Sequence, residues 1–328
     1  MRRKHLSVWA GILLVVALTV VLAAGCGGDE GTTAASPSPT EQLTPQEIVD
    51  QCTAAMNEVT SASFTADFKI DVQGDASKVT DETARQLLAK PITLHAEGAS
   101  STDPQAADVD LALSFSGQNL AMTILNEGKK AWVQYQGTWY AVPPEQTKAL
   151  QAGESGGAPE QQLRELGLDP KAWNVEWELA GIETVDDIQV YHLTASPDPK
   201  KIAGDLMKTL NDPDFYKKLG DQATAAQVKA LQKENAALLK QVQKALDSLD
   251  VELWIETGSK YLRKSTLLVG MDTKAIKGAK GLTAMTLGFS LGMADFGQPV
   301  EVTPPAKAKS FDKLMNDLTG GMTPGASL

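Results

Sequence analysis

The chain has 328 residues, 30 basic and 41 acidic side chains, and 42% hydrophobic residues. Three of the basic residues lie within the first 25, so the remainder carries 27 basic against 41 acidic side chains, a net charge of −14. This balance argues against a nucleic-acid protein and against adhesion to anionic lipid through surface charge, because both need a basic face. The hydrophobic content is enough for a packed core, and the length allows one large or two ordinary domains.

Residues 1–25 have the layout of an export signal. Basic residues 2–4 precede an apolar run over 6–24, and small residues end the segment. The run is also just long enough to span a bilayer, so an uncleaved membrane anchor is the alternative. Residues 22–26 (LAAGC) resemble a bacterial lipobox, which implies cleavage before Cys26 and lipidation of its thiol.

Residues 26–42 are predicted to be a lipidated cysteine and a flexible linker, because they are rich in Gly, Ser, Thr and Pro and lack large apolar side chains. We expect one domain over 43–318, held outside the cytoplasmic membrane, and a flexible tail over 319–328. Cys52 is the other cysteine of the chain, and acylation of Cys26 would leave it no disulfide partner. Its position on an apolar stripe predicts a buried, inert thiol.

The first predicted element of the domain is an amphipathic helix. Thr44, Pro45 and Glu47 combine a capping residue, a proline at the first helical position and the glutamate of a capping box. Apolar residues then recur at helical spacing from Ile48 to Val59. The helix is therefore expected to begin at Thr44.

From Ala62 the apolar pattern changes to a period of two, which is typical of antiparallel strands with one wet face. About ten or eleven strands with short turns favour an α+β fold with a strongly curved antiparallel sheet, or half-open barrel, covered by a helical layer. Strands are expected at 62–72, 92–96, 109–115, 120–124, 132–142 (a hairpin turning at Gln136–Gly137), 174–180, 188–195, 251–256, 261–271 and 282–295.

Helices are expected to interrupt the sheet at 77–90, within 145–173 and over 198–249, with a last helix at 310–318. Within the long insertion 198–249, apolar residues from Val228 to Leu249 hold a heptad register, which would suit a coiled-coil partner. The stripe is wider than a narrow seam, so packing against the protein's own sheet is the favoured interpretation.

Residues suited to catalysis are few. His95 and His192 are expected to be surface or hydrogen-bonded strand residues, and one free thiol is too few for a Cys/His zinc site. Residues 153–157 match Gly-x-Ser-x-Gly around Ser155, but no apolar strand precedes them, which favours a chance match. The aspartate pairs in the chain are expected to be solvated. We therefore predict no catalytic centre, metal site or cofactor.

The informative feature is the apolar alternation itself. A strongly curved sheet under a few helices could enclose an apolar cavity, and the alternative is a filled core; the sequence leaves both open. Methionines among these positions offer a surface that repacks around different apolar shapes. The predicted cavity lining is Phe64, Phe68, Ile70, Leu94, Leu111, Leu113, Phe115, Met122, Ile124, Met271, Met285, Leu287 and Phe289.

Several segments in succession carry a family resemblance: WVQY at 132–135, GIETVD at 181–186, VELWIE at 251–256 and ADFGQPVEV at 294–302. Their order is similar to that of LppX/LprG-type lipoproteins of actinobacteria, which share the fold of the LolA and LolB carriers. The resemblance implies a half-open barrel on a helical layer, an acyl-chain cavity between them, and carriage of a lipid or lipoglycan without catalysis. The insertion 198–249 departs from the family pattern.

Two functions follow from these observations as expectations. The first is a lipoprotein anchored to the extracytoplasmic face of the cell membrane through acylated Cys26, which binds lipid or lipoglycan acyl chains for transport or sensing across the envelope. The alternative is a protein-interaction or sensor lipoprotein with a filled core, in which the helices of 198–249 contact an envelope protein partner.

Overall fold

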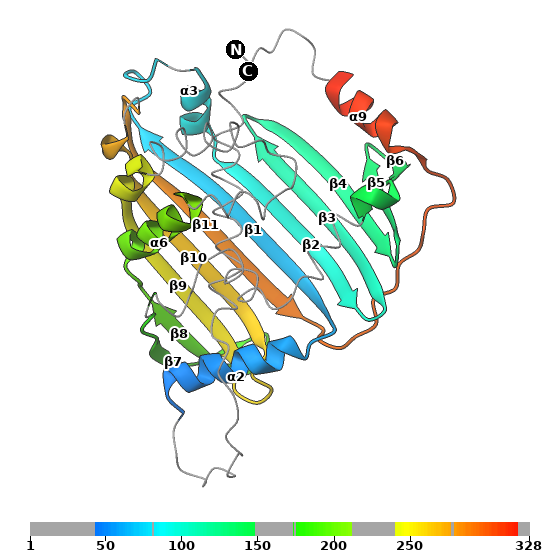
Figure 1. Cartoon of the computed structure of the whole chain (residues 1–328), viewed down its shortest axis with the longest axis horizontal. Helices are drawn as coiled ribbons and strands as arrows, with labels where there is room; N and C mark the ends of the chain where they lie inside the picture. The colour runs from blue at the N-terminus through cyan, green and yellow to red at the C-terminus, as the bar shows by residue number, and fades with distance from the viewer. Residues whose placement is uncertain are drawn as a thin grey trace. The chain divides into compact units, whose positions relative to one another are not determined.

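The computed structural model describes residues 43–80, 82–147, 173, 175–211, 240–276 and 279–320. The described residues form two compact units. Unit 1 comprises those up to Glu58 and from Trp173 to Thr286, and unit 2 those from Val59 to Thr147 and from Leu287 to Gly320. The twelve strands described belong to one large, curved sheet with few helices, so the expected fold class is confirmed (Figure 1).

Unit 2 is a meander of antiparallel strands. Its strands β1 to β6 pair with one another in chain order, and a two-residue strand, β12, pairs with β6 in parallel. The elements are β1 (Ser61–Gly74), α3 (Glu82–Ala89), β2 (Ile92–Thr102), β3 (Gln105–Phe115), β4 (Gln118–Glu127), β5 (Lys130–Tyr135), β6 (Thr138–Ala141), β12 (Lys309–Ser310) and α9 (Phe311–Gly320). The second half of β11 (Leu282–Ala294) also belongs to this unit.

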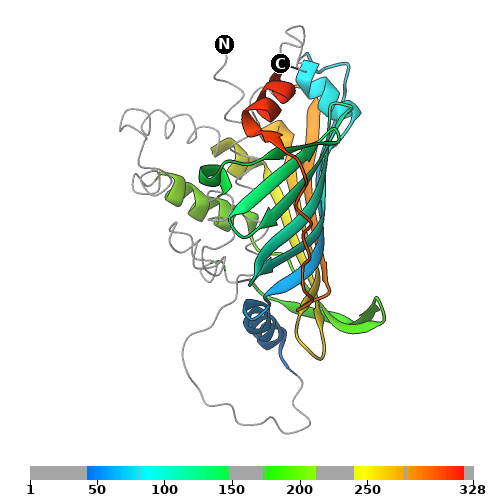
Figure 2. The ribbon, with the colours of Figure 1, turned by 90° about the vertical axis from the view of Figure 1, so that its right-hand side faces the viewer.

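Tight turns set the register of these strands. Ser116 and Gly117 join β3 to β4, and Gln136 and Gly137 join β5 to β6, with positive φ at both residues of each pair. Such turns match the right-handed twist of the flanking strands. The hairpin expected at Gln136–Gly137 is confirmed. After β11 the chain runs along the strands of unit 2 to reach α9 (Figure 2).

Unit 1 packs helices against strands β7 to β10, which are neighbours in that order, with the first half of β11 beyond β10. Its elements are α2 (Pro45–Asn57), β7 (Glu178–Val185), β8 (Ile188–Ala195), α6 (Pro199–Asn211), β9 (Leu246–Glu256), β10 (Leu262–Asp272) and a 3-10 turn η2 (Thr273–Ala275). Helices α2 and α6 both contact β9. The buried core of the unit includes Ile48, Val49, Val190, Leu193, Ile202, Leu249, Val251, Leu253, Ile255, Leu267 and Val269.

Helix α2 begins as predicted. Thr44 N donates to Glu47 Oε2 at 2.7 Å, and Glu47 N donates to Thr44 Oγ1 at 3.3 Å, so the capping box is complete. The buried face of the helix includes Ile48 and Cys52. Burial raises the pKa of the Cys52 thiol to about 12, which leaves it protonated and unreactive at neutral pH, as the sequence predicted.

Several predicted boundaries were wrong. Strand β2 extends to Thr102 rather than ending at 96, β3 begins at Gln105 rather than at 109, and α3 begins at Glu82 rather than at 77. The strand expected at 174–180 is β7 at 178–185, because the hairpin to β8 turns at Asp186 and Asp187, both with positive φ. The heptad register predicted to run to Leu249 ends earlier, since β9 already begins at Leu246. There the apolar residues follow a period of two rather than a helical one. The start of that register, around Val228, lies outside the described residues.

Candidate functional site

Unit 2 presents one apolar face and one polar face. Because directly paired residues of antiparallel strands point to the same side, the register assigns every side chain to a face. Phe68, Leu94 and Leu113 pair in succession across β1, β2 and β3, and Leu111 pairs with Met122 of β4. Nine predicted lining residues share this face: Phe64, Phe68, Ile70, Leu94, Leu111, Leu113, Phe115, Met122 and Ile124.

Small residues occupy the middle of the apolar face. Ala66 pairs with Ala96, which pairs in turn with Leu111, and Gly98 lies in the next row between Phe64 and Val109. Rows of larger side chains lie on either side of these positions. At these positions the side chains of β1 and β2 are shorter than those of β3. This leaves a shallow depression in which a flexible apolar chain can lie.

Burial differs along this face. Phe68 and Ile70 are buried, whereas Phe64, Leu94, Leu111, Leu113 and Phe115 are only half-buried. Apolar side chains in the middle of a sheet are normally buried in a folded domain, so half-burial of contiguous residues marks a surface suited to an apolar ligand.

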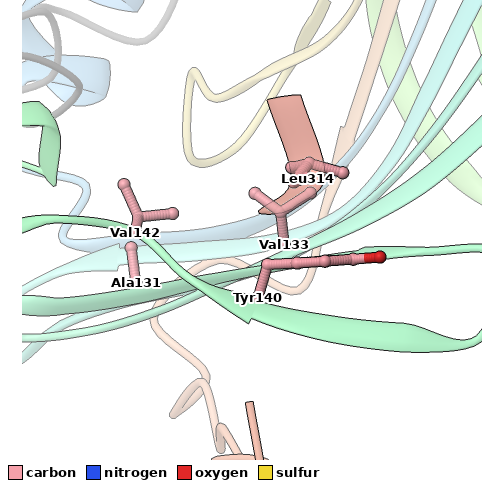
Figure 3. Packing of buried hydrophobic residues seen from close by; sticks show 5 residues of the cluster. All are labelled: Ala131, Val133, Tyr140, Val142 and Leu314. Atoms are coloured by element: carbon pink, nitrogen blue, oxygen red, sulfur yellow. The ribbon is translucent and has the colours of Figure 1, made fainter. Parts of the chain in front are cut away.

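Helix α9 covers the β5–β6 end of the same face. Leu314 packs against a buried cluster of Ala131, Val133, Tyr140 and Val142 (Figure 3). Met122, Ile124, Tyr135 and Phe311 pack around this cluster. Two predicted lining residues, Met122 and Ile124, thus contribute to a filled hydrophobic cluster. The half-buried residues over β1, β2 and β3 lie outside this cluster.

The remaining predicted lining residues are distributed over both units. Met271, at the end of β10, is buried in unit 1 and pairs with Leu246 of β9. Met285 also belongs to unit 1, whereas Leu287 and Phe289 lie in the part of β11 that belongs to unit 2. The structure therefore assembles nine of the predicted residues on one face, and Met271 is core of the other unit.

The polar face of unit 2 carries a pocket that the sequence did not predict. Its volume is about 500 Å³. Ala112 and Ala121, paired across β3 and β4, form its floor. Four residues paired across β2 to β5 form one wall: Glu97, Asp110, Thr123 and Gln134. His95 lies at one end of the floor, and Asn119, Gln136 and Gly137 also line the pocket. Leu111, Met122 and Tyr135, which belong to the apolar face, contribute to the lining as well. The sequence indicated a wet face here, but not which residues meet.

Hydrogen bonds fix part of this lining. Thr123 Oγ1 donates to Asp110 Oδ1 at 2.6 Å, and His95 Nδ1 contacts Asp67 Oδ1 at 2.7 Å. The hydrogen bond with Asp67 raises the pKa of His95 above its ordinary value, with a smaller contribution from Glu97 at 3.6 Å. Burial raises the pKa of Asp108, and the neighbouring Asp110 charge adds to that rise.

A second polar cluster lies in unit 1. The ring of His192 stacks on Trp254 with centroids 4.4 Å apart. Its Nδ1 lies 2.8 Å from Glu183 Oε1, and its Nε2 lies 3.0 Å from Glu252 Oε2. These contacts hold the pKa of Glu183 below its usual range, aided by the indole N–H of Trp254 and the charge of Lys264. His192 is therefore a hydrogen-bonded strand residue, as expected.

Other expected features can be placed only in part. In the described ranges, no three His, Cys, Asp or Glu side chains gather where they could bind a metal ion. Those ranges also contain no helix long and apolar enough to cross a bilayer. The signal over 1–25, Cys26, the linker and Ser155 lie outside them. Ile202 and Ala203 of α6 are buried, and α6 contacts β9. Most of the apolar stripe from Val228, for which packing on the sheet was favoured, lies outside the described residues.

Comparisons with known proteins give likenesses of structure. No family model and no curated protein matches the sequence. Lipoprotein LppX of Mycobacterium tuberculosis is similar at 15% identity over 77% of this chain and 94% of its own, with a TM-score of 0.34. LprF of Mycobacterium bovis is similar at 14% identity over 83% of this chain and 100% of its own, with a TM-score of 0.38. A DUF1329 family protein of Desulfovibrio piger is similar at 10% identity over 77% and 92%, with a TM-score of 0.20. Solved structures similar to this chain thus include the LppX-type lipoproteins that its sequence resembles.

Proposed function

We propose that this chain is a membrane-anchored, extracytoplasmic lipoprotein that binds acyl chains of a lipid or lipoglycan on the apolar face of unit 2, for transport or sensing across the envelope. The observation that carries the proposal is the half-buried apolar stretch made by Phe64, Leu94, Leu111 and Leu113 around Ala66 and Ala96. The protein's role in this proposal is binding, without a chemical step.

The energetics favour a long apolar ligand over a compact one. Each methylene taken from water contributes about 0.8 kcal/mol. The apolar rows run across β1 to β4, so an extended chain can contact several strands at once. The polar face on the other side of the same strands keeps the sheet solvated while the apolar face is occupied.

Native mass spectrometry is the first test. A form without residues 1–26, purified from its own host, is expected to carry an adduct with the mass of a lipid. The same form, after delipidation, should take up a fluorescent fatty acid. A protein that is reproducibly free of adduct and refuses the fatty acid would end the proposal.

A substitution pair locates the binding face. Ala96 and Ala99 lie on the same strand, on the apolar and polar faces respectively. Ala96→Phe fills the low part of the apolar face and should weaken fatty-acid binding about tenfold or more. Ala99→Phe adds the same ring on the opposite side and should leave binding unchanged. If both changes weaken fatty-acid binding equally, the apolar face is not the binding site.

The anchor is tested separately. Cys26→Ala in the full chain removes the thiol that the proposal acylates. Without this thiol the variant should lose incorporation of labelled palmitate. It should also lose its stable membrane anchor, because such anchoring takes two acyl chains. Undiminished incorporation would show that the thiol of Cys26 is not the acylated group, whatever unit 2 binds.

A further inference from the structure

The pocket of unit 2 opens among the polar-face side chains of β2 to β5, and Leu111, Met122 and Tyr135 of the apolar face also contribute to its lining. Its floor alanines, Ala112 and Ala121, are exposed, and each pairs with the other across β3 and β4. The pocket, at about 500 Å³, is within the range of small-molecule sites. Polar side chains and apolar atoms share its lining, which points to a ligand that has both polar groups and apolar surface.

The lining groups restrict the chemistry of that ligand. Glu97 and Asp110 offer carboxylate oxygens, which accept hydrogen bonds and repel anions. Gln134, Asn119 and Gln136 offer carboxamides, which both donate and accept. A simple ammonium group could satisfy the carboxylates, but it has no acceptor for the amide N–H donors. A hydroxyl group both donates and accepts, and it carries no charge.

Several of these groups have hydrogen-bonding capacity to spare. Asp110 uses Oδ1 to accept from Thr123, which orients its carboxylate at the wall. Within the described part of the chain, Gln134 and Asn119 make no hydrogen bond through their side chains. Trp139 pairs with Gln134 on the same face, so a half-buried aromatic side chain lies next to the wall. Trp139 does not itself line the pocket, but the lining has apolar atoms beside carboxylates and amides, and this combination suits a ring that has both C–H and O–H groups.

From this arrangement we propose that the polar face of unit 2 binds a saccharide in the pocket floored by Ala112 and Ala121. Hydroxyl groups of the sugar donate to Glu97 and Asp110 and accept from the carboxamide of Gln134. The polar groups of the site lie on the face opposite the acyl-binding one, and the proposal does not depend on the proposed function. A free oligosaccharide and the sugar chains of a surface polymer share this chemistry.

The test uses the full chain, solubilised in a detergent without sugar groups. Soluble gluco-, manno- and galacto-configured trisaccharides are titrated while amide chemical shifts are followed by NMR. We expect saturable shifts at β2 to β5 for at least one of them. Asp110→Asn and Gln134→Ala should each weaken that binding about tenfold, because each removes a hydrogen bond made to the ligand.

Ala121→Phe provides a variant that fills the pocket without touching the core, since Ala121 is exposed. It should abolish saccharide binding and leave fatty-acid binding intact, which separates this proposal from the previous one. Ala141→Phe is the matched control, an exposed alanine on the same face but outside the pocket, and it should bind like the parent.

Saturable binding of a trisaccharide supports the proposal, and a polysaccharide pull-down that Ala121→Phe abolishes would identify a polymer as the source. The proposal is overturned if no saccharide gives a saturable shift. It is equally overturned if Ala121→Phe and Ala141→Phe bind the sugar alike, or if the pocket takes only a polyamine such as spermidine.

Discussion

The two units use the same alternation of apolar residues and bury it to different extents. In unit 1, Leu253 is 1% exposed and lies on β9, the strand that both α2 and α6 contact. In unit 2, Leu111 occupies an equivalent place in the middle of an apolar face and is only half-buried. A period of two therefore indicates which face is apolar, but the cover supplied by other elements decides whether that face is core or binding surface.

The largest expected effect compares these two leucines. Leu253→Ala removes a fully buried side chain and should cost about 4 kcal/mol of unfolding free energy through lost contacts and a cavity. Leu111→Ala should cost about 2 kcal/mol, because part of the side chain is already exposed and its removal leaves no closed cavity. Urea unfolding followed by circular dichroism measures both. Equal losses would mean that the unit 2 face is packed like the core of unit 1.

The next comparison uses a glycine from each unit. A Cβ added to Gly98 would lie 2.0 Å from the backbone oxygen of Asp108, so β2 and β3 must separate. A Cβ on Gly270 would lie 2.5 Å from Oγ of Ser248, a side chain that can rotate away. Gly98→Ala is expected to cost about 3 kcal/mol and Gly270→Ala about 1 kcal/mol. Thermal unfolding of both variants gives the order, and the reverse order would show that this close approach is absent in solution.

The smallest effect concerns His95, on the polar face of unit 2. Its hydrogen bond with Asp67 raises the pKa of the histidine above its ordinary value of 6.5. The contribution to stability is complete below about pH 6.5 and is lost as the pH rises through the raised value. It should stay below about 1 kcal/mol, because the pair is exposed.

NMR titration of the His95 ring measures this shift directly. Asp67→Asn should lower the midpoint towards the ordinary value. Asp71→Asn, which removes a carboxylate that pairs with Lys69 instead, should leave it unchanged. An identical midpoint in the parent and in Asp67→Asn would contradict the hydrogen bond.

The sequence predicted those features that depend on neighbouring residues. The capping box at Thr44, the hairpin at Gln136–Gly137 and the apolar face of β1 all follow from local patterns. The polar pocket of unit 2 could not be predicted from local patterns, because it depends on strand register. Only pairing brings Ala112 opposite Ala121 and aligns Glu97 with Asp110.

The same reason explains the cluster around His192. Glu252 is 60 residues away along the chain and reaches the imidazole only because β8 pairs with β9. The boundary of β9 was wrong for a different reason. Leu246 and Leu249 are three residues apart, which fits a helical spacing. The antiparallel pairing with β10 nevertheless extends the strand back to Leu246 across a register shift.

The measurement that tests the central claim most directly is photo-crosslinking with a fatty acid that carries a diazirine along its acyl chain, followed by peptide mass spectrometry. We predict labels on β1, β2 and β3 of unit 2, at Phe64, Leu94, Leu111 or Leu113, which decrease when unlabelled fatty acid competes. Labels confined to unit 1, or spread over both units without competition, would contradict the assignment of acyl-chain binding to the apolar face of unit 2.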